Sequence, residues 1–209
     1  MNYSYSSETG SLAPLAFFVD APLIANFFVL LQQGVRVRRR VGCTVDAFLR
    51  HEIEAGPEMI ERIQSIMLDG KAVDDIGSAV VQDGATLALS AAMPGLGGAT
   101  LRRGGAYSSF RSAITFHEAG QTAASGEGWV TVKVFNLLMA ELGPGLFRRG
   151  VRVKAADLLS VLAEHAQELR QGCSVTLNGG PMDIGMLGRS EGLTGTGTVF
   201  LSLSSGAAA

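Results

Sequence analysis

The chain is poor in residues that bind metals or form covalent cross-links. Its 209 residues include two cysteines, Cys43 and Cys173, and three histidines. A structural zinc site needs four close ligands, and the two cysteines give no metal-ligand spacing. Two cysteines also make no disulfide framework of the kind found in small secreted proteins. We therefore expect two buried thiols in a reducing cytoplasm, with no metal and no other cofactor.

Charge and long apolar runs are also scarce. The formal net charge is −2, and neither half of the chain is basic overall. A domain that binds nucleic acid usually has a basic excess, so we expect no nucleic-acid partner. The apolar stretch 12–31 is interrupted by Pro14, Asp20, Pro22 and Asn26, and no basic segment precedes it. This pattern is not that of a membrane span or a signal peptide, so we expect no membrane partner and a cytoplasmic location.

Motifs of catalysis are missing from the sequence. The glycine-rich run 95–98 is followed neither by the Gly-Lys-Ser/Thr of a phosphate-binding loop nor by the helix of a dinucleotide site. The pair His117-Glu118 lacks the second histidine of a metalloprotease motif. No serine lies in a nucleophile-elbow context. We therefore expect no catalytic residues and a protein that is not an enzyme.

The chain does contain an ordered set of short motifs that occurs twice. The first set is Val35-Arg36-Val37, a helix with Asp46, Leu68-Asp69-Gly70 and 86–90, and the second is Val151-Arg152-Val153, a helix with Asp157, Leu177-Asn178-Gly179 and 198–202. The repeated order predicts two small domains of one fold. The alternative is one α+β domain in which the short motifs coincide by chance.

The elements of the first set follow from residue patterns. Alternation in 35–41 predicts a strand with its valines on one side. Thr44 is a plausible N-cap for a helix in which Leu49 faces a sheet, as Leu159 would in the second helix. The Asp69-Gly70 pair predicts a tight turn. The remaining expected elements are strands at 15–19, 63–68, 71–76 and 85–93, a helix at 21–33 closed by Gly34, and a helical turn at 58–62.

The order strand, strand, helix, strand, short strand, strand is that of β-grasp proteins. The segments TVDAFL (44–49), IMLDGKAVDD (66–75) and QDGATLAL (82–89) resemble the ubiquitin-like sulfur carriers, which include the small subunit of molybdopterin synthase and the thiamine-pathway carrier. The second set resembles them through VTVKVFNLL (130–138), ADLLSVL (156–162) and VTLNG (175–179).

The resemblance implies an α+β chain of two tandem β-grasp domains, each with a curled mixed sheet and one main helix. The expected boundaries are a flexible arm at 1–11, a first domain at 12–98, a linker at 99–128 and a second domain at 129–209.

The resemblance also bears on chemistry, because a sulfur carrier is adenylated and thiolated on the carboxylate of a terminal Gly-Gly. Here the glycine pairs Gly97-Gly98 and Gly104-Gly105 are internal, and the second unit ends at 204–209 without such a pair. We therefore expect a non-enzymatic binding or assembly module, with a protein partner or self-association. One alternative is a carrier or modifier processed to expose Gly98 or Gly105, whose partner would be an adenylating enzyme. Another is an enzyme with a site between the units.

Basic residues cluster at matching places in the two motif sets. Such a cluster is a candidate interaction edge that would recruit an acidic protein surface or phosphate, whereas basic edge strands also prevent unwanted strand pairing. The cluster consists of Arg36, Arg38, Arg39 and Arg40 in the first set and Arg148, Arg149, Arg152 and Lys154 in the second.

Overall fold

A computed structural model describes residues 14–91, 101–103, 105, 125–189 and 197–205. Most strands of the described residues join one sheet: β1 (Pro14–Val19), β2 (Val35–Val41), β4 (Ser65–Leu68), β5 (Lys71–Ala72), β7 (Thr86–Ser90), β8 (Gly126–Phe135), β9 (Val151–Lys154), β10 (Cys173–Leu177), β11 (Gly180–Met182) and β12 (Thr198–Ser205). The sheet has ten strands in the order β11-β10-β1-β12-β9-β2-β8-β7-β4-β5. The short strands β3 (Cys43–Thr44) and β6 (Val80–Val81) pair separately.

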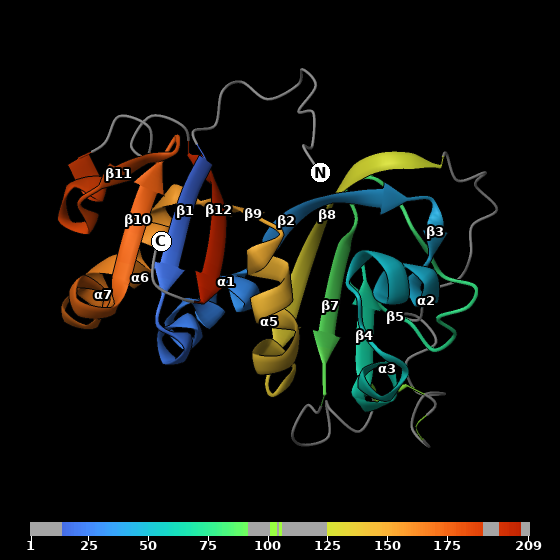
Figure 1. Cartoon of the computed structure of the whole chain (residues 1–209). Coiled ribbons are helices and arrows are strands. Elements are labelled where there is room, and N and C mark those ends of the chain that lie inside the picture. Colours follow the sequence, from blue (N-terminus) through green and yellow to red (C-terminus); the bar gives the residue numbers. More distant parts are fainter. Residues whose placement is uncertain (1–13, 92–100, 104, 106–124, 190–196, 206–209) are drawn as a thin grey trace.

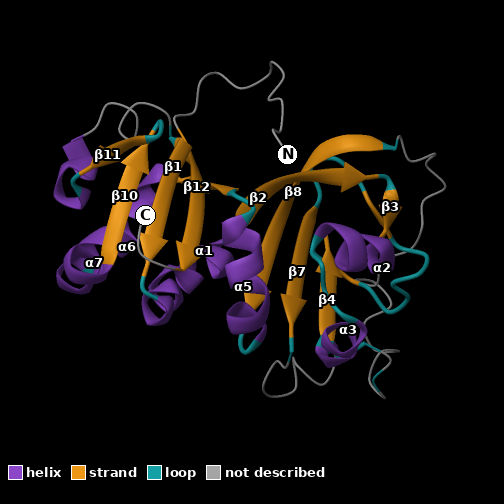
Figure 2. Ribbon diagram, in the orientation of Figure 1, coloured by secondary structure: helices purple, strands orange, loops and turns teal. Residues whose placement is uncertain are grey.

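The helices of the described residues pack along this sheet (Figure 2). They are η1 (Ala21–Phe27), α1 (Phe28–Gln33), α2 (Val45–Ala47), η2 (Phe48–Glu52), α3 (Pro57–Arg62), α5 (Leu138–Arg148), α6 (Ala155–Glu164), α7 (Ala166–Gly172) and η4 (Ile184–Arg189). In Figure 1, α6 lies behind β10 and β1 whereas α2 lies in front of β4, which reflects the strong twist of the sheet. None of these helices is long and apolar enough to cross a membrane.

One face of the sheet is apolar across its central strands. Val132 of β8 lies opposite Val35 of β2 on one side and beside Leu87 of β7 on the other, and all three are fully buried. Residues paired across neighbouring strands point to the same side of a sheet, so these three share a face, and the helices cover it. The next residue of β2, Arg36, is exposed. We call the side on which Arg36 lies the open face.

The expectation of two tandem β-grasp domains is wrong, because a single continuous sheet crosses the chain. β8 comes from the second motif set but lies between β2 and β7 of the first. β1 precedes every other described strand but lies between β12 and β10 of the second. The repeated motifs predict the order of local elements along the chain. They do not predict which strands pair, because partners far apart in the sequence depend on the packing of the whole sheet. Each half of the sheet is therefore completed by a strand from the other half of the chain.

The two Val-Arg-Val motifs meet at the centre of the sheet. β2 and β9 are antiparallel neighbours, with Arg36 directly opposite Arg152. Moving outward from this pair, the strand directions repeat on both sides, because β12 and β8 are antiparallel to their inner neighbours while β1 and β7 are parallel to theirs. The repeated motifs are thus neighbours in space.

Several local predictions are confirmed. Gly34 closes α1 with a φ of 111°, and its N–H donates to the carbonyl of Leu30. The hydroxyl of Thr44 accepts a hydrogen bond from the Ala47 N–H at 3.2 Å, as expected of an N-cap. Asp69 and Gly70 both have positive φ, 51° and 77°, as a tight hairpin turn requires.

The prediction for the two helix leucines is half right. Leu49 is fully buried, but Leu159 is only partly buried and its neighbour Leu158 fills the core position instead. The prediction misplaced the buried side of α6 by one residue, because Leu158, Val161 and Leu162 are the residues that face the core. Gly126–Gly128, placed in the expected linker 99–128, are the first residues of β8. The rest of that linker, apart from 101–103, 105 and 125, and the expected arm 1–11 lie outside the described residues.

Candidate functional site

Basic and aromatic side chains gather at the middle of the open face. The register places Phe200 of β12 opposite Arg152, Arg152 opposite Arg36, and Arg38 opposite Trp129 of β8. These strands, β12, β9, β2 and β8, are adjacent in the sheet. We call this cluster the central patch; it consists of Arg36, Arg38, Trp129, Arg152 and Phe200.

These side chains lie on the open face because buried and outward-facing residues alternate along each strand. Val35 and Val37 of β2, and Val130 and Val132 of β8, are fully buried on the helix-covered face. The residues between and beside them must point the other way, because successive side chains of a strand alternate. Arg36 and Trp129 therefore lie on the open face as a consequence of the buried valines.

Trp129 lies within cation–π distance of two arginines of the patch. The guanidinium carbon of Arg152 is 4.0 Å from the centre of its ring, and that of Arg36 is 5.4 Å away. Both distances lie within the range of cation–π attraction, in which the negative face of the ring stabilises the charge. The backbone N–H of Trp129 donates to the carboxylate of Asp83 at 2.6 Å, and its carbonyl accepts from Gly84. The backbone that carries the indole is thereby fixed to the turn before β7.

Phe200 lies against a glycine that leaves room for its ring. Gly150, just before β9, has a φ of +82°, and a Cβ atom placed there would lie 2.1 Å from Phe200 Cζ. The Gly150 N–H donates to the carbonyl of Phe147, so the backbone is fixed by the end of α5. Only glycine satisfies both the positive φ and the close approach of the ring. The ring is in this way fixed beside Arg152.

The central patch is strongly positive. Arg36 and Arg38 are exposed, and Lys154 is exposed where β9 ends. The carboxylate of Glu127 pairs with one member of this group, since its Oε2 lies 3.1 Å from Nε of Arg38. The chain as a whole has a net charge of −2, so the positive charge of this face is local.

The eight basic residues predicted as an interaction edge lie in different parts of the structure. Arg36, Arg38 and Arg152 join the central patch in the interior of the sheet, while its edges are β5 and β11. Arg40 and Lys154 are exposed on strands β2 and β9, and Arg148 is exposed on α5.

Arg39 and Arg149, the other two predicted residues, stabilise the end of a helix. Arg39 Nε donates to the carbonyl of Glu52 at 3.3 Å, and Arg149 Nη2 donates to that of Ile53 at 3.1 Å. Arg149 also pairs with the Glu54 carboxylate at 3.0 Å. Cations beside the last carbonyls of a helix satisfy groups that have no partner within the helix, so these two arginines hold the end of η2.

The candidate processing tails are described only in part. Gly97, Gly98 and Gly104 lie outside the described residues. The N–H of Gly105 donates to the carbonyl of Arg102 at 3.1 Å. The N–H of Arg103 donates to the carbonyl of Gln64 at 2.7 Å, which attaches this segment to the body of the protein between α3 and β4.

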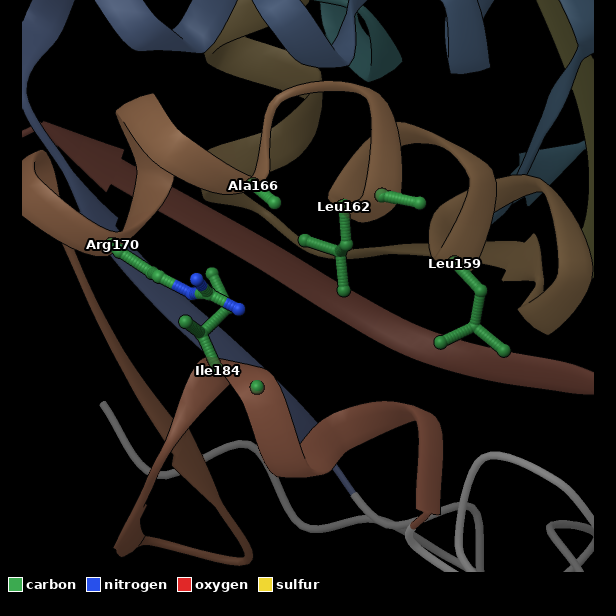
Figure 3. A pocket seen from close by; sticks show the side chains of 7 residues that line it. Leu159, Leu162, Ala166, Arg170 and Ile184 are labelled. Atoms are coloured by element: carbon green, nitrogen blue, oxygen red, sulfur yellow. The ribbon is translucent and has the colours of Figure 1, made fainter.

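The thiols and the cavity offer little chemistry. Burial, and then the charge of Asp20, raises the pKa of Cys173 to about 11, and burial also raises the pKa of Cys43. Both thiols are therefore protonated, and poor nucleophiles, at neutral pH. A cavity of about 220 Å³ is lined by Leu159, Leu162, Ala163, Ala166, Arg170, Ile184 and Gly185 (Figure 3). Arg170 is its one charged lining residue, so it holds no acid–base pair. The described residues contain no group of three potential metal ligands.

Trp129, Gly150 and Phe200 were not predicted as site residues. The alternation of valines in 130–134 would have placed Trp129 opposite the core, and this is the signal that sequence reasoning could have used. That signal does not say which strands lie beside β8. The cluster exists only because β2, β9 and β12 are brought next to it.

The chain matches no protein-family model, no curated protein and no solved structure with which it was compared. The resemblance to the sulfur carriers therefore stays a prediction from short motifs. The arginines around Trp129 are the feature of the described residues that bears most directly on function.

Proposed function

We propose that the protein is a non-enzymatic binding or assembly module whose partner contacts the open face at the central patch. The observation that carries the proposal is the placement of Arg36 and Arg152 around Trp129, in the middle of a sheet face opposite the described helices. Arginine and tryptophan are the residues most enriched among the energetically dominant contacts of protein interfaces. A cluster of them on a rigid sheet is suited to binding.

An enzymatic function has less support. A catalytic site needs a nucleophile or an acid–base pair in a water-excluding pocket. The described cavity is apolar apart from Arg170, and burial holds the pKa of both thiols above their usual range. The central patch itself contains cations and aromatic rings but no base. Its chemistry is recognition of an anionic or aromatic group.

The test is site-specific photo-cross-linking in the cells in which the chain is expressed. A benzophenone amino acid replaces Thr86, which lies beside Thr131 in the row that continues from Arg36 across the open face. The matched control replaces Glu58, which is exposed on α3. We expect discrete adducts from position 86 and none from position 58, identified by mass spectrometry.

Self-association gives an adduct of twice the chain mass, and a separate partner gives another mass. Both outcomes support a binding module. Adducts from position 58 alone, or from neither position, would contradict the proposal.

A further inference from the structure

We propose that the central patch recognises carboxylates, and that its partner is an acidic peptide segment of a protein. This inference rests on the proposed function and adds the chemistry of the partner. Three features of the patch carry it: the guanidinium groups near the indole, the carboxylate that the chain itself places on this face, and the opposed pair Arg36 and Arg152.

A guanidinium group that stacks on an aromatic ring keeps its hydrogen-bond donors. The cation–π contact uses the face of the planar group, while its N–H bonds point outward from the edge. The guanidinium carbons of Arg152 and Arg36 lie 4.0 and 5.4 Å from the centre of the Trp129 ring, and Arg36 is exposed. Within the described residues Arg36 forms no ion pair. A fork of parallel N–H donors fits the two oxygens of a carboxylate, so the indole holds Arg36 ready for such a ligand.

The chain already provides an example of this contact. Glu127 lies on β8 two residues before Trp129, on the same face, and its carboxylate pairs with Arg38 at 3.1 Å. The side chains of Arg38 and Glu127 are 42% and 70% exposed, so burial does not force the two groups together. The open face therefore already binds one carboxylate, at Arg38, which lies two residues after Arg36 on β2.

The opposed arginines favour an anion between them. Arg36 and Arg152 face each other directly in the antiparallel pair of β2 and β9. Like charges directly opposite each other in a sheet are unfavourable. Trp129 offsets part of this repulsion through its two cation–π contacts. A carboxylate bound by Arg36, which is exposed, would lower this repulsion further.

The same geometry disfavours single-stranded nucleic acid. Such ligands stack bases on free aromatic faces along a continuous basic groove. The ring of Trp129 is already in contact with two guanidinium groups, and Phe200 packs against Gly150. The net charge of −2 also opposes a long phosphate chain. A short acidic peptide needs only the local positive charge of the patch.

The test measures fluorescence anisotropy of three labelled probes with the full chain. The probes are a twelve-residue peptide of alternating Glu and Ser, the same peptide with Gln in place of Glu, and a twelve-nucleotide oligouridylate. We expect the Glu peptide to bind and the Gln peptide not to bind, with the oligouridylate weaker than the Glu peptide. Arg36→Gln should weaken the Glu peptide about tenfold, since a hydrogen bond to a charged group contributes on the order of 1.5 kcal/mol or more.

Two further variants separate the fork from simple charge. Arg148→Gln removes one positive charge from an exposed position on α5, on the side of the sheet that the helices cover. We expect this variant to bind the Glu peptide with an affinity within about twofold of that of the unchanged chain. Arg36→Lys keeps the charge but loses the planar fork, so it should bind nearly as weakly as Arg36→Gln. Circular dichroism of each variant shows that the fold is kept.

Tighter binding of the oligouridylate than of the Glu peptide would overturn the inference in favour of nucleic acid. Equal losses for Arg148→Gln and Arg36→Gln, or full affinity of Arg36→Lys, would show attraction by net charge rather than carboxylate recognition. If the Glu peptide fails to bind although position 86 forms adducts in cells, the carboxylate inference is wrong and the proposed function stands.

Discussion

Replacing Gly150 with alanine tests the packing that holds Phe200 in the central patch. The backbone φ of +82° costs an alanine about 1–2 kcal/mol, because its Cβ approaches the carbonyl oxygen. The new methyl group would also lie 2.1 Å from Phe200 Cζ, so the ring must move, and such overpacking costs about 1–3 kcal/mol. We expect Gly150→Ala to lower the free energy of unfolding by about 2–5 kcal/mol.

A second glycine serves as the matched control. Gly179 has nearly the same φ, +81°, but no atom lies within 4 Å of the position of its Cβ. Gly179→Ala should therefore show only the backbone cost of about 1–2 kcal/mol. The difference between the two variants isolates the contact with Phe200. Urea unfolding followed by circular dichroism and by the fluorescence of the single tryptophan, Trp129, measures both.

A double-mutant cycle checks the cause. In a Phe200→Ala background the ring is gone, so adding Gly150→Ala should cost about as much as Gly179→Ala does. If Gly150→Ala is no more destabilising than Gly179→Ala, or if its cost is unchanged without the ring of Phe200, the proposed packing is refuted.

Three further results are expected. Leu49→Ala should lower the free energy of unfolding by about 2–5 kcal/mol, and the half-buried Leu159→Ala by clearly less, in urea melts. Thr44→Ala should cost about 1 kcal/mol through loss of its N-cap hydrogen bond, whereas Thr44→Ser should cost little. Because burial raises the pKa of Cys173 to about 11 from 9.0, alkylation by iodoacetamide at pH 8 should be about 100-fold slower in the folded than in the unfolded chain. This raised pKa also means that the stabilising contribution of the protonated thiol is complete below pH 9.0 and is lost as the pH rises through about 11. Equal alkylation rates in the folded and unfolded chains would contradict the burial of this thiol.

Local elements could be predicted from the sequence because their causes are local. The alternating valines of 35–41 fix a strand of those bounds, and Asp69-Gly70 forms the expected turn with two positive φ angles. Gly34 ends its helix as its conformational freedom suggests. In each case a few neighbouring residues decide the backbone conformation.

The arrangement of strands could not be read in the same way. Nothing near β8 in the sequence distinguishes β2 from β9 as its neighbour, since both contain Val-Arg-Val. The choice depends on the total packing of α1, α5 and the sheet, which no short motif encodes. The same limit applies to the site. Arg36 and Arg152 were predicted as counterparts on separate units, and only the continuous sheet makes them direct neighbours around Trp129.

The order in which strands join the sheet has a consequence for folding. β1 is synthesised long before its partners β10 and β12. β2 likewise pairs with β8, which follows it by roughly ninety residues. Such non-local pairing slows folding, because a long loop must close before any contact compensates its loss of entropy. Until β10 and β12 have been added, the backbone edges of β1 have neither of their strand partners, and its apolar side chains must be protected from other chains. Once closed, neither half can open without removing a strand from the other, so unfolding should occur in a single cooperative step.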